Sequence, residues 1–155
     1  MESNKQPIIA NQYFSYVSAE CQRLFDNEYY YGCIALSQSL AEAYARFMYE
    51  QYANEKPEKW FYENITKHRE YEVKPDVTEL LTELYEQRNT FHHLKPDVPR
   101  EFVKLKSIAT KKIELLNKVE TQVFEIIDLT PGNMKFKYPK YWETDKVDSL
   151  YLKID

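Results

Sequence analysis

Apolar residues recur every three or four positions along most of the chain, which is the spacing of an amphipathic helix. This pattern predicts five helices. They run from just after Pro7 to Phe25, from Tyr29 to Tyr52, from Pro57 to Arg69, from Asp76 to Leu94 and from Asp97 to Asp128.

Capping and proline signals set the ends of the last two helices. Asp76 is a suitable N-cap, and Glu79 three residues later can complete a capping box. Pro96 disfavours the helical conformation at the residue before it and ends the fourth helix. Asp97 is expected to cap the fifth helix, with Pro99 in its first turn.

Long helices with short connections predict an all-α fold, a four- to five-helix up-and-down bundle over residues 1–128. A short C-terminal extension, residues 129–155, follows a Pro-Gly turn at Thr130–Asn133. Apolar residues alternate with polar ones on both sides of this extension, so it can form a small β-hairpin or remain a flexible arm.

Composition narrows the function classes. Two glycines, Gly32 and Gly132, lie a hundred residues apart, so the chain has no glycine-rich phosphate loop or dinucleotide fingerprint. No apolar stretch is long enough to span a membrane and the N-terminus has no basic leader, which predicts a cytoplasmic protein with no membrane partner. Cys21 and Cys33 lack a CxxC partner and only three histidines are present, so we expect buried free thiols, no metal and no cofactor.

The net charge of −4 is unevenly distributed, since residues 95–140 contain 10 Lys and Arg against 6 Asp and Glu. A solvated helix face is one explanation for such a basic segment, and a polyanionic partner is the other.

The cluster Arg88-Asn89-Thr90-Phe91-His92-His93 stands apart from the helical background. On a continuous helix Arg88 and His92 lie about 40° apart, whereas Arg88 and His93 lie about 140° apart. Arg88 also falls on the apolar stripe of the predicted fourth helix, where a permanent cation needs an anion. A structural explanation is that Arg88 pairs with a carboxylate such as Glu42 and that the histidines cap helix carbonyls.

Two segments resemble the HEPN superfamily. RNTFHH is similar to its arginine, polar residue, three residues, histidine signature, matched at Arg88, Asn89 and His93. YYGCIALSQSLAEAYARFMYE is similar to a second HEPN pattern, with Gln38 and Glu42 at the matching positions. The two quoted segments together contain 27 of the 155 residues. The family pattern favours His93 as the acting histidine, and straight-helix geometry favours His92.

The resemblance implies a metal-independent endoribonuclease that uses the RNA's own 2′-OH and leaves a cyclic phosphate, as in a toxin or defence effector. A histidine would transfer protons, Arg88 would neutralise the phosphoryl charge, Asn89 would orient the site and Glu42 would support it. The family further implies a homodimer with a composite site and a protein inhibitor as a partner.

Positive side chains follow the cluster and provide a path for RNA phosphates, first at Lys95, Arg100 and Lys104. Lys106, Lys111, Lys112 and Lys118 continue it, and the aromatic and basic segment Lys135–Trp142 suits either single-strand stacking or a packed hairpin edge. Two alternatives remain at this point. One is a non-catalytic HEPN module that binds RNA, nucleotide or a protein, and the other is an unrelated helical adaptor.

Overall fold

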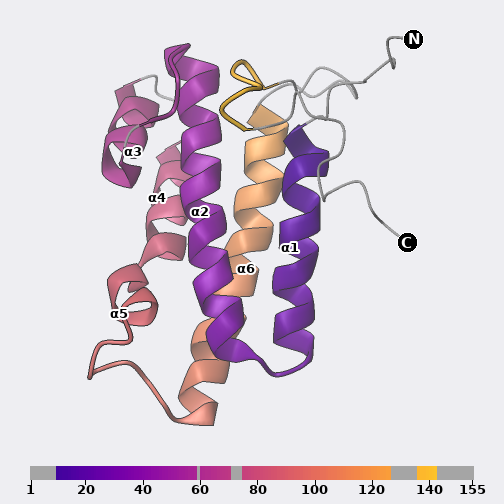
Figure 1. Ribbon diagram of the computed structural model, residues 1–155, viewed down its shortest axis with the longest axis vertical. Coiled ribbons are helices and arrows are strands. Elements are labelled where there is room, and N and C mark those ends of the chain that lie inside the picture. The colour runs from indigo at the N-terminus through magenta and orange to yellow at the C-terminus, as the bar shows by residue number, and fades with distance from the viewer. Residues whose placement is uncertain (1–9, 59, 71–74, 127–135, 143–155) are drawn as a thin grey trace.

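The computed structural model describes residues 10–58, 60–70, 75–126 and 136–142, and these residues form six helices and no strand (Figure 1). The all-α prediction is confirmed. The helices are α1 (Ala10–Asp26), α2 (Tyr30–Ala53), α3 (Phe61–Glu70), α4 (Pro75–Tyr85), α5 (Arg88–His92) and α6 (Phe102–Ile126).

Helix α2 is the central element of the bundle. It packs against α1, α3, α4 and α6, while α6 also contacts α1 and α4. In Figure 1 the α2–α6 pair lies between α1 on one side and α4 on the other. Thirteen of the 24 residues of α2 are buried, so this helix is apolar around most of its circumference, as expected for a central one.

The core is filled by aromatic and aliphatic side chains from the four longest elements of the bundle. Tyr44, Phe47 and Met48 of α2 are fully buried and meet Phe14 of α1, whose ring centroid lies 4.6 Å from that of Tyr44. Leu81 and Leu84 of α4 and Leu116 and Val119 of α6 complete the main core. No helix in the described residues is long and apolar enough to cross a membrane.

The predicted fourth helix is wrong in one respect, because it is interrupted. Helix α4 ends at Tyr85, Gln87 has a left-handed backbone with φ of 64°, and α5 starts at Arg88. Arg88 therefore does not continue the apolar stripe of Leu81 and Leu84. Arg88 and His92 still share one helical turn, because both lie in α5.

The predicted start of the last helix is also wrong. Helix α6 begins at Phe102, with a first helical bond from the Leu105 amide to the Glu101 carbonyl, so Asp97 is not its cap and Pro99 is outside it. A helix capped by Asp97 would need Val98 in the helical region, which the following proline disfavours. Val98 is instead buried at the end of a turn that its amide closes onto the Lys95 carbonyl.

Residues 136–142 of the C-terminal extension fold back onto the bundle in a turn conformation. Phe136 and Trp142 are buried there, with their ring centroids 4.8 Å apart and that of Phe136 5.5 Å from Phe47. These two rings therefore belong to the core and are not available to stack on nucleic acid. The rest of the predicted hairpin lies outside the described residues.

A buried carboxylate at the end of α2 holds this segment. Glu50 is fully buried, and its two oxygens accept hydrogen bonds from the Trp142 indole at 2.8 Å and from the Lys137 amide at 3.1 Å. Burial raises the pKa of Glu50, although these donors oppose the rise by stabilising the carboxylate. The folded protein thus holds a proton on Glu50 more tightly than the unfolded chain does.

We predict that Glu50 gives the folding free energy a measurable pH dependence. Because its folded-state pKa is raised, its contribution is largest below the unfolded pKa and is lost as the pH rises through the folded value. Wild type should therefore gain stability relative to Glu50→Gln as the pH falls from 7 toward 4.5, as measured by urea denaturation at a series of pH values. Glu58→Gln, an exposed glutamate paired with Lys56, is the control. Parallel curves for wild type and Glu50→Gln would contradict this prediction.

Candidate functional site

The first five residues of the RNTFHH cluster form α5, and the sixth, His93, is its C-cap. A helix this short is not stable by itself in water, so its position depends on contacts with the rest of the protein. Phe91 provides one of them, since its side chain is fully buried and its ring centroid lies 5.6 Å from that of Tyr31 of α2. The Tyr31 hydroxyl also donates a hydrogen bond to the Phe91 carbonyl. One face of α5 is thereby fixed to α2.

The chain just before α5 is held by a buried ammonium group. Lys112 of α6 is almost fully buried, and its Nζ donates to the carbonyls of Glu83, Leu84 and Glu86 at 2.8, 2.9 and 3.1 Å. The Glu83 and Leu84 carbonyls belong to the last turn of α4, where the regular hydrogen bonds of the helix end, and Glu86 follows directly after the helix. Burial lowers the pKa of Lys112 to about 8, so the group is still mainly charged at neutral pH.

Gln38 of α2 binds the same junction. Its side chain is fully buried, and Nε2 donates to the Glu86 carbonyl at 2.8 Å. Within the described residues its Oε1 has no hydrogen-bond partner. The sequence pattern that singled out Gln38 therefore coincides with a residue that fixes the start of α5.

The polar face of α5 points away from these anchors. Asn89, His92 and His93 are exposed and Arg88 is partly exposed, so the four candidate catalytic residues lie on one short turn at the surface. His93 is the C-cap residue, and its amide donates to the Asn89 carbonyl at 3.2 Å. An exposed guanidinium can bind an oxyanion and a nearby imidazole can transfer a proton, so this turn has the groups that phosphoryl chemistry needs.

The expected ion pair between Arg88 and Glu42 is not formed. Glu42 accepts a hydrogen bond from Arg46, its neighbour one turn along α2, at 2.6 Å. Within the described part of the chain Arg88 makes no ion pair. The reason is local: the (i, i+4) spacing brings Arg46 to Glu42 on the same helix, whereas Arg88 is on another element.

The charges of Glu42, Arg46 and Arg88 nevertheless all act on one side chain, Tyr85. Burial raises the pKa of Tyr85, the charge of Arg88 lowers it, that of Glu42 raises it, and Arg46 has a smaller lowering effect. The Tyr85 ring is stacked on Phe61 with centroids 3.8 Å apart. Sequence reasoning missed Arg46 and Tyr85. The (i, i+4) relation to Glu42 is the signal that could have identified Arg46.

The side chains of the predicted phosphate path differ in their exposure. Lys95, Arg100 and Lys104 are all exposed and follow directly after α5. Lys112 does not belong to this path, because it is buried against the α4 carbonyls, while its neighbour Lys111 is exposed and pairs with Glu83 at 2.5 Å.

Among the described residues, no group of three or more histidine, cysteine, aspartate or glutamate side chains could hold a metal ion. Comparison with family models, curated proteins and solved structures finds no match for this chain. The arguments for its function therefore rest on its own residues and their geometry.

We expect Lys112→Met to destabilise the protein strongly. The substitution keeps the aliphatic stem but removes the side-chain donor of the buried Leu84 carbonyl and one donor each from the Glu83 and Glu86 carbonyls, which should cost about 2–4 kcal/mol in urea denaturation. Lys111→Met is the matched control, because it removes the adjacent lysine, which is exposed, and should have little effect. Equal losses from the two variants would show that the buried ammonium does not hold the junction.

Proposed function

We propose that this protein is a metal-independent endoribonuclease of the HEPN type. The observation that carries the proposal is that Arg88, Asn89, His92 and His93 lie together at the surface on α5 and its C-cap, a turn held by partly buried hydrogen bonds at Phe91 and at Glu86 just before it. A surface turn anchored in this way keeps its side chains in fixed relation to one another, which is what a catalytic group requires.

The proposed reaction uses groups that belong to the RNA and to α5. The 2′-OH attacks the adjacent phosphorus, the bond to the 5′ oxygen breaks, and a 2′,3′-cyclic phosphate and a free 5′-OH remain. One imidazole takes the proton of the 2′-OH as general base, and a second acidic group gives a proton to the departing 5′ oxygen. Arg88 stabilises the charge on the five-coordinate phosphorus, and Asn89 orients the phosphate or the histidine.

One copy of the cluster supplies few groups for both proton transfers, because His92 and His93 occupy adjacent positions whose directions on a helix differ by about 100°. We therefore propose a homodimer in which the two α5 faces meet and share one composite site. Glu42 supports this site through Arg46, and the exposed Lys95, Arg100 and Lys104 bind the phosphates of the flanking nucleotides. The enzyme would act in the cytoplasm and be held in check by a protein inhibitor.

The catalytic proposal predicts RNA cleavage in the presence of EDTA. Unstructured RNA incubated with the protein should yield cyclic-phosphate ends, as read by gel and mass spectrometry. Arg88→Ala and the double variant His92→Ala/His93→Ala should each lower the cleavage rate about 100-fold or more, because each removes charge stabilisation or proton transfer. Separate His92→Ala and His93→Ala variants would then identify which ring acts.

Arg23→Ala, which removes an exposed arginine on α1, is the control and should cleave like wild type. Circular dichroism should show that the α5 variants stay folded, since the side chains that they remove are at the surface. If wild type binds RNA without cleaving it, the protein is a non-catalytic RNA-binding module and not an enzyme. If wild type neither binds nor cleaves RNA, the result favours a helical adaptor.

The composite site predicts a dimer at micromolar concentration. Sedimentation equilibrium should give twice the mass of the 18.7 kDa chain. A strictly monomeric protein that still cleaves RNA would contradict the shared site without contradicting the ribonuclease activity.

A further inference from the structure

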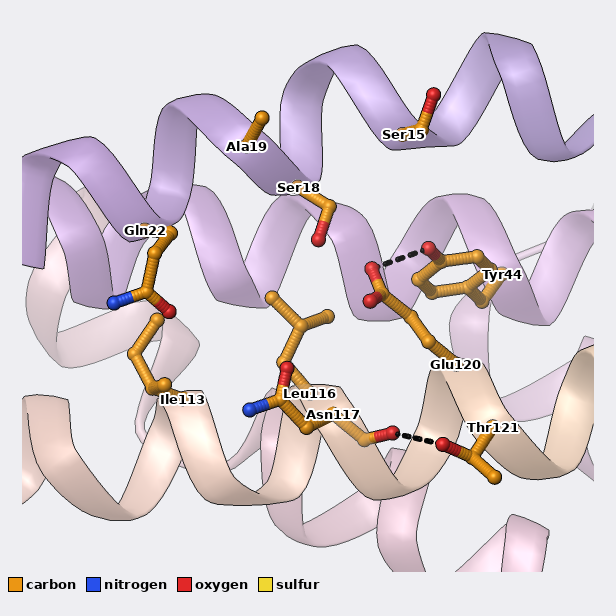
Figure 2. A pocket seen from close by; sticks show the side chains of 10 residues that line it. All are labelled: Ser15, Ser18, Ala19, Gln22, Tyr44, Ile113, Leu116, Asn117, Glu120 and Thr121. Carbon is orange, nitrogen blue, oxygen red and sulfur yellow. Dashed lines mark hydrogen bonds between the residues drawn. The ribbon is translucent and has the colours of Figure 1, made fainter.

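A groove lies between α1 and α6, on the side of the bundle away from α3 and α4 (Figures 1 and 2). Its volume is about 660 Å³, which is within the range of small-molecule sites. The α1 wall consists of small or polar residues, and the α6 wall carries both apolar and polar ones. The lining includes Ser18 and Gln22 of α1 and Ile113, Leu116, Asn117 and Glu120 of α6.

A carboxylate is fixed at one end of this groove. The hydroxyl of Tyr44, a fully buried residue of α2, donates to Glu120 Oε1 at 2.7 Å. Burial and the charge of Glu120 both raise the pKa of Tyr44, so the phenol remains a donor across the physiological pH range. Figure 2 shows the Glu120 carboxylate between the Tyr44 hydroxyl and the Ser18 side chain.

This carboxylate has no cationic partner. Within the described part of the chain no lysine, arginine or histidine lies within ion-pair distance of Glu120, although four other acidic residues there are paired. The Tyr44 hydroxyl donates a hydrogen bond to one oxygen of the Glu120 carboxylate. The other oxygen can accept a hydrogen bond from a ligand.

The floor next to the carboxylate is apolar. Ile113 and Leu116 are almost fully buried residues of α6 that still line the groove. Figure 2 shows Leu116 between the Glu120 end and the Gln22 end of the groove, and Ile113 beside Gln22. Helix pairs normally fill such space with interdigitating side chains, but Ser18 and Ala19 are too small to reach across it.

We propose that this groove binds a short aliphatic amine, with its ammonium on Glu120 and the Ser18 hydroxyl and its methylene chain over Leu116 and Ile113. A charge-assisted hydrogen bond to the carboxylate provides the orientation, and the apolar floor provides burial. Farther along the groove from Glu120, the amide oxygens of Gln22 and Asn117 can accept hydrogen bonds from a second amino group. The site is separate from α5 and does not depend on the ribonuclease proposal.

The groove suits a small molecule better than a helix of another protein. A docked helix needs a continuous apolar stripe, whereas the rim here is polar and exposed at Ser15, Gln22, Asn117 and Thr121. A single carboxylate above an apolar floor instead matches one ammonium on an alkyl stem.

Calorimetric titration with putrescine, 1,4-diaminobutane, tests this site. Wild type should bind it, and amide NMR shifts should concentrate at Ser18, Gln22 and the α6 residues from Ile113 to Glu120. Glu120→Gln should weaken binding by about tenfold or more, because the charge-assisted bond is lost while an acceptor for Tyr44 remains. Ser18→Leu should also abolish binding, because it fills the groove without changing any charge.

Two controls separate the site from general attraction to an acidic protein. Glu114→Gln removes an exposed acid from the same helix outside the groove, and it should bind putrescine like wild type. The uncharged diol 1,4-butanediol should not bind. The proposal is overturned if wild type does not bind putrescine, if Glu114→Gln weakens binding as much as Glu120→Gln, or if the diol binds as well as the diamine.

Discussion

The ammonium group of Lys112 ends one helix and allows the next to begin. Its Nζ donates to the carbonyls of Glu83 and Leu84 at the C-terminal end of α4 and to that of Glu86 just after it, where the hydrogen bonds within the helix come to an end. With these carbonyls satisfied from α6, the chain can take the left-handed conformation at Gln87 and start α5 in a new direction. A side chain 24 residues after the start of α5 thus decides where the candidate site lies.

In the candidate site, one side of α5 fixes the position of the helix and the other side carries the candidate catalytic residues. Buried contacts of Phe91 with Tyr31, and of the preceding backbone with Gln38, fix the inner side of α5. The outer side carries Arg88 and the two histidines, none of which is needed for packing. A proposed catalytic turn of this design can change its polar residues without losing its position, since position and chemistry depend on different atoms.

Buried polar groups elsewhere in the molecule act in a similar way. Glu50 accepts hydrogen bonds from the Trp142 indole and the Lys137 amide and so attaches residues 136–142 to the end of α2. Tyr44 fixes the orientation of Glu120 at one end of the α1–α6 groove. Each of these groups would cost free energy if it were buried alone, and each instead joins elements that are far apart in sequence.

The sequence by itself determined what local physics controls. The 3.6-residue period gave the all-α class and the extent of α1 and α2 to within a few residues, and residue chemistry together with the HEPN resemblance marked the Arg88 to His93 cluster as a candidate site. Only the tertiary structure decided the break before Arg88, because the chain there contains neither glycine nor proline and the Glu86 carbonyl, just before the left-handed Gln87, is held by partners from α2 and α6. The same holds for the two adjacent lysines of α6. Lys111 and Lys112 look alike in sequence, but a rotation of about 100° along the helix leaves one in solvent and buries the other at the end of α4.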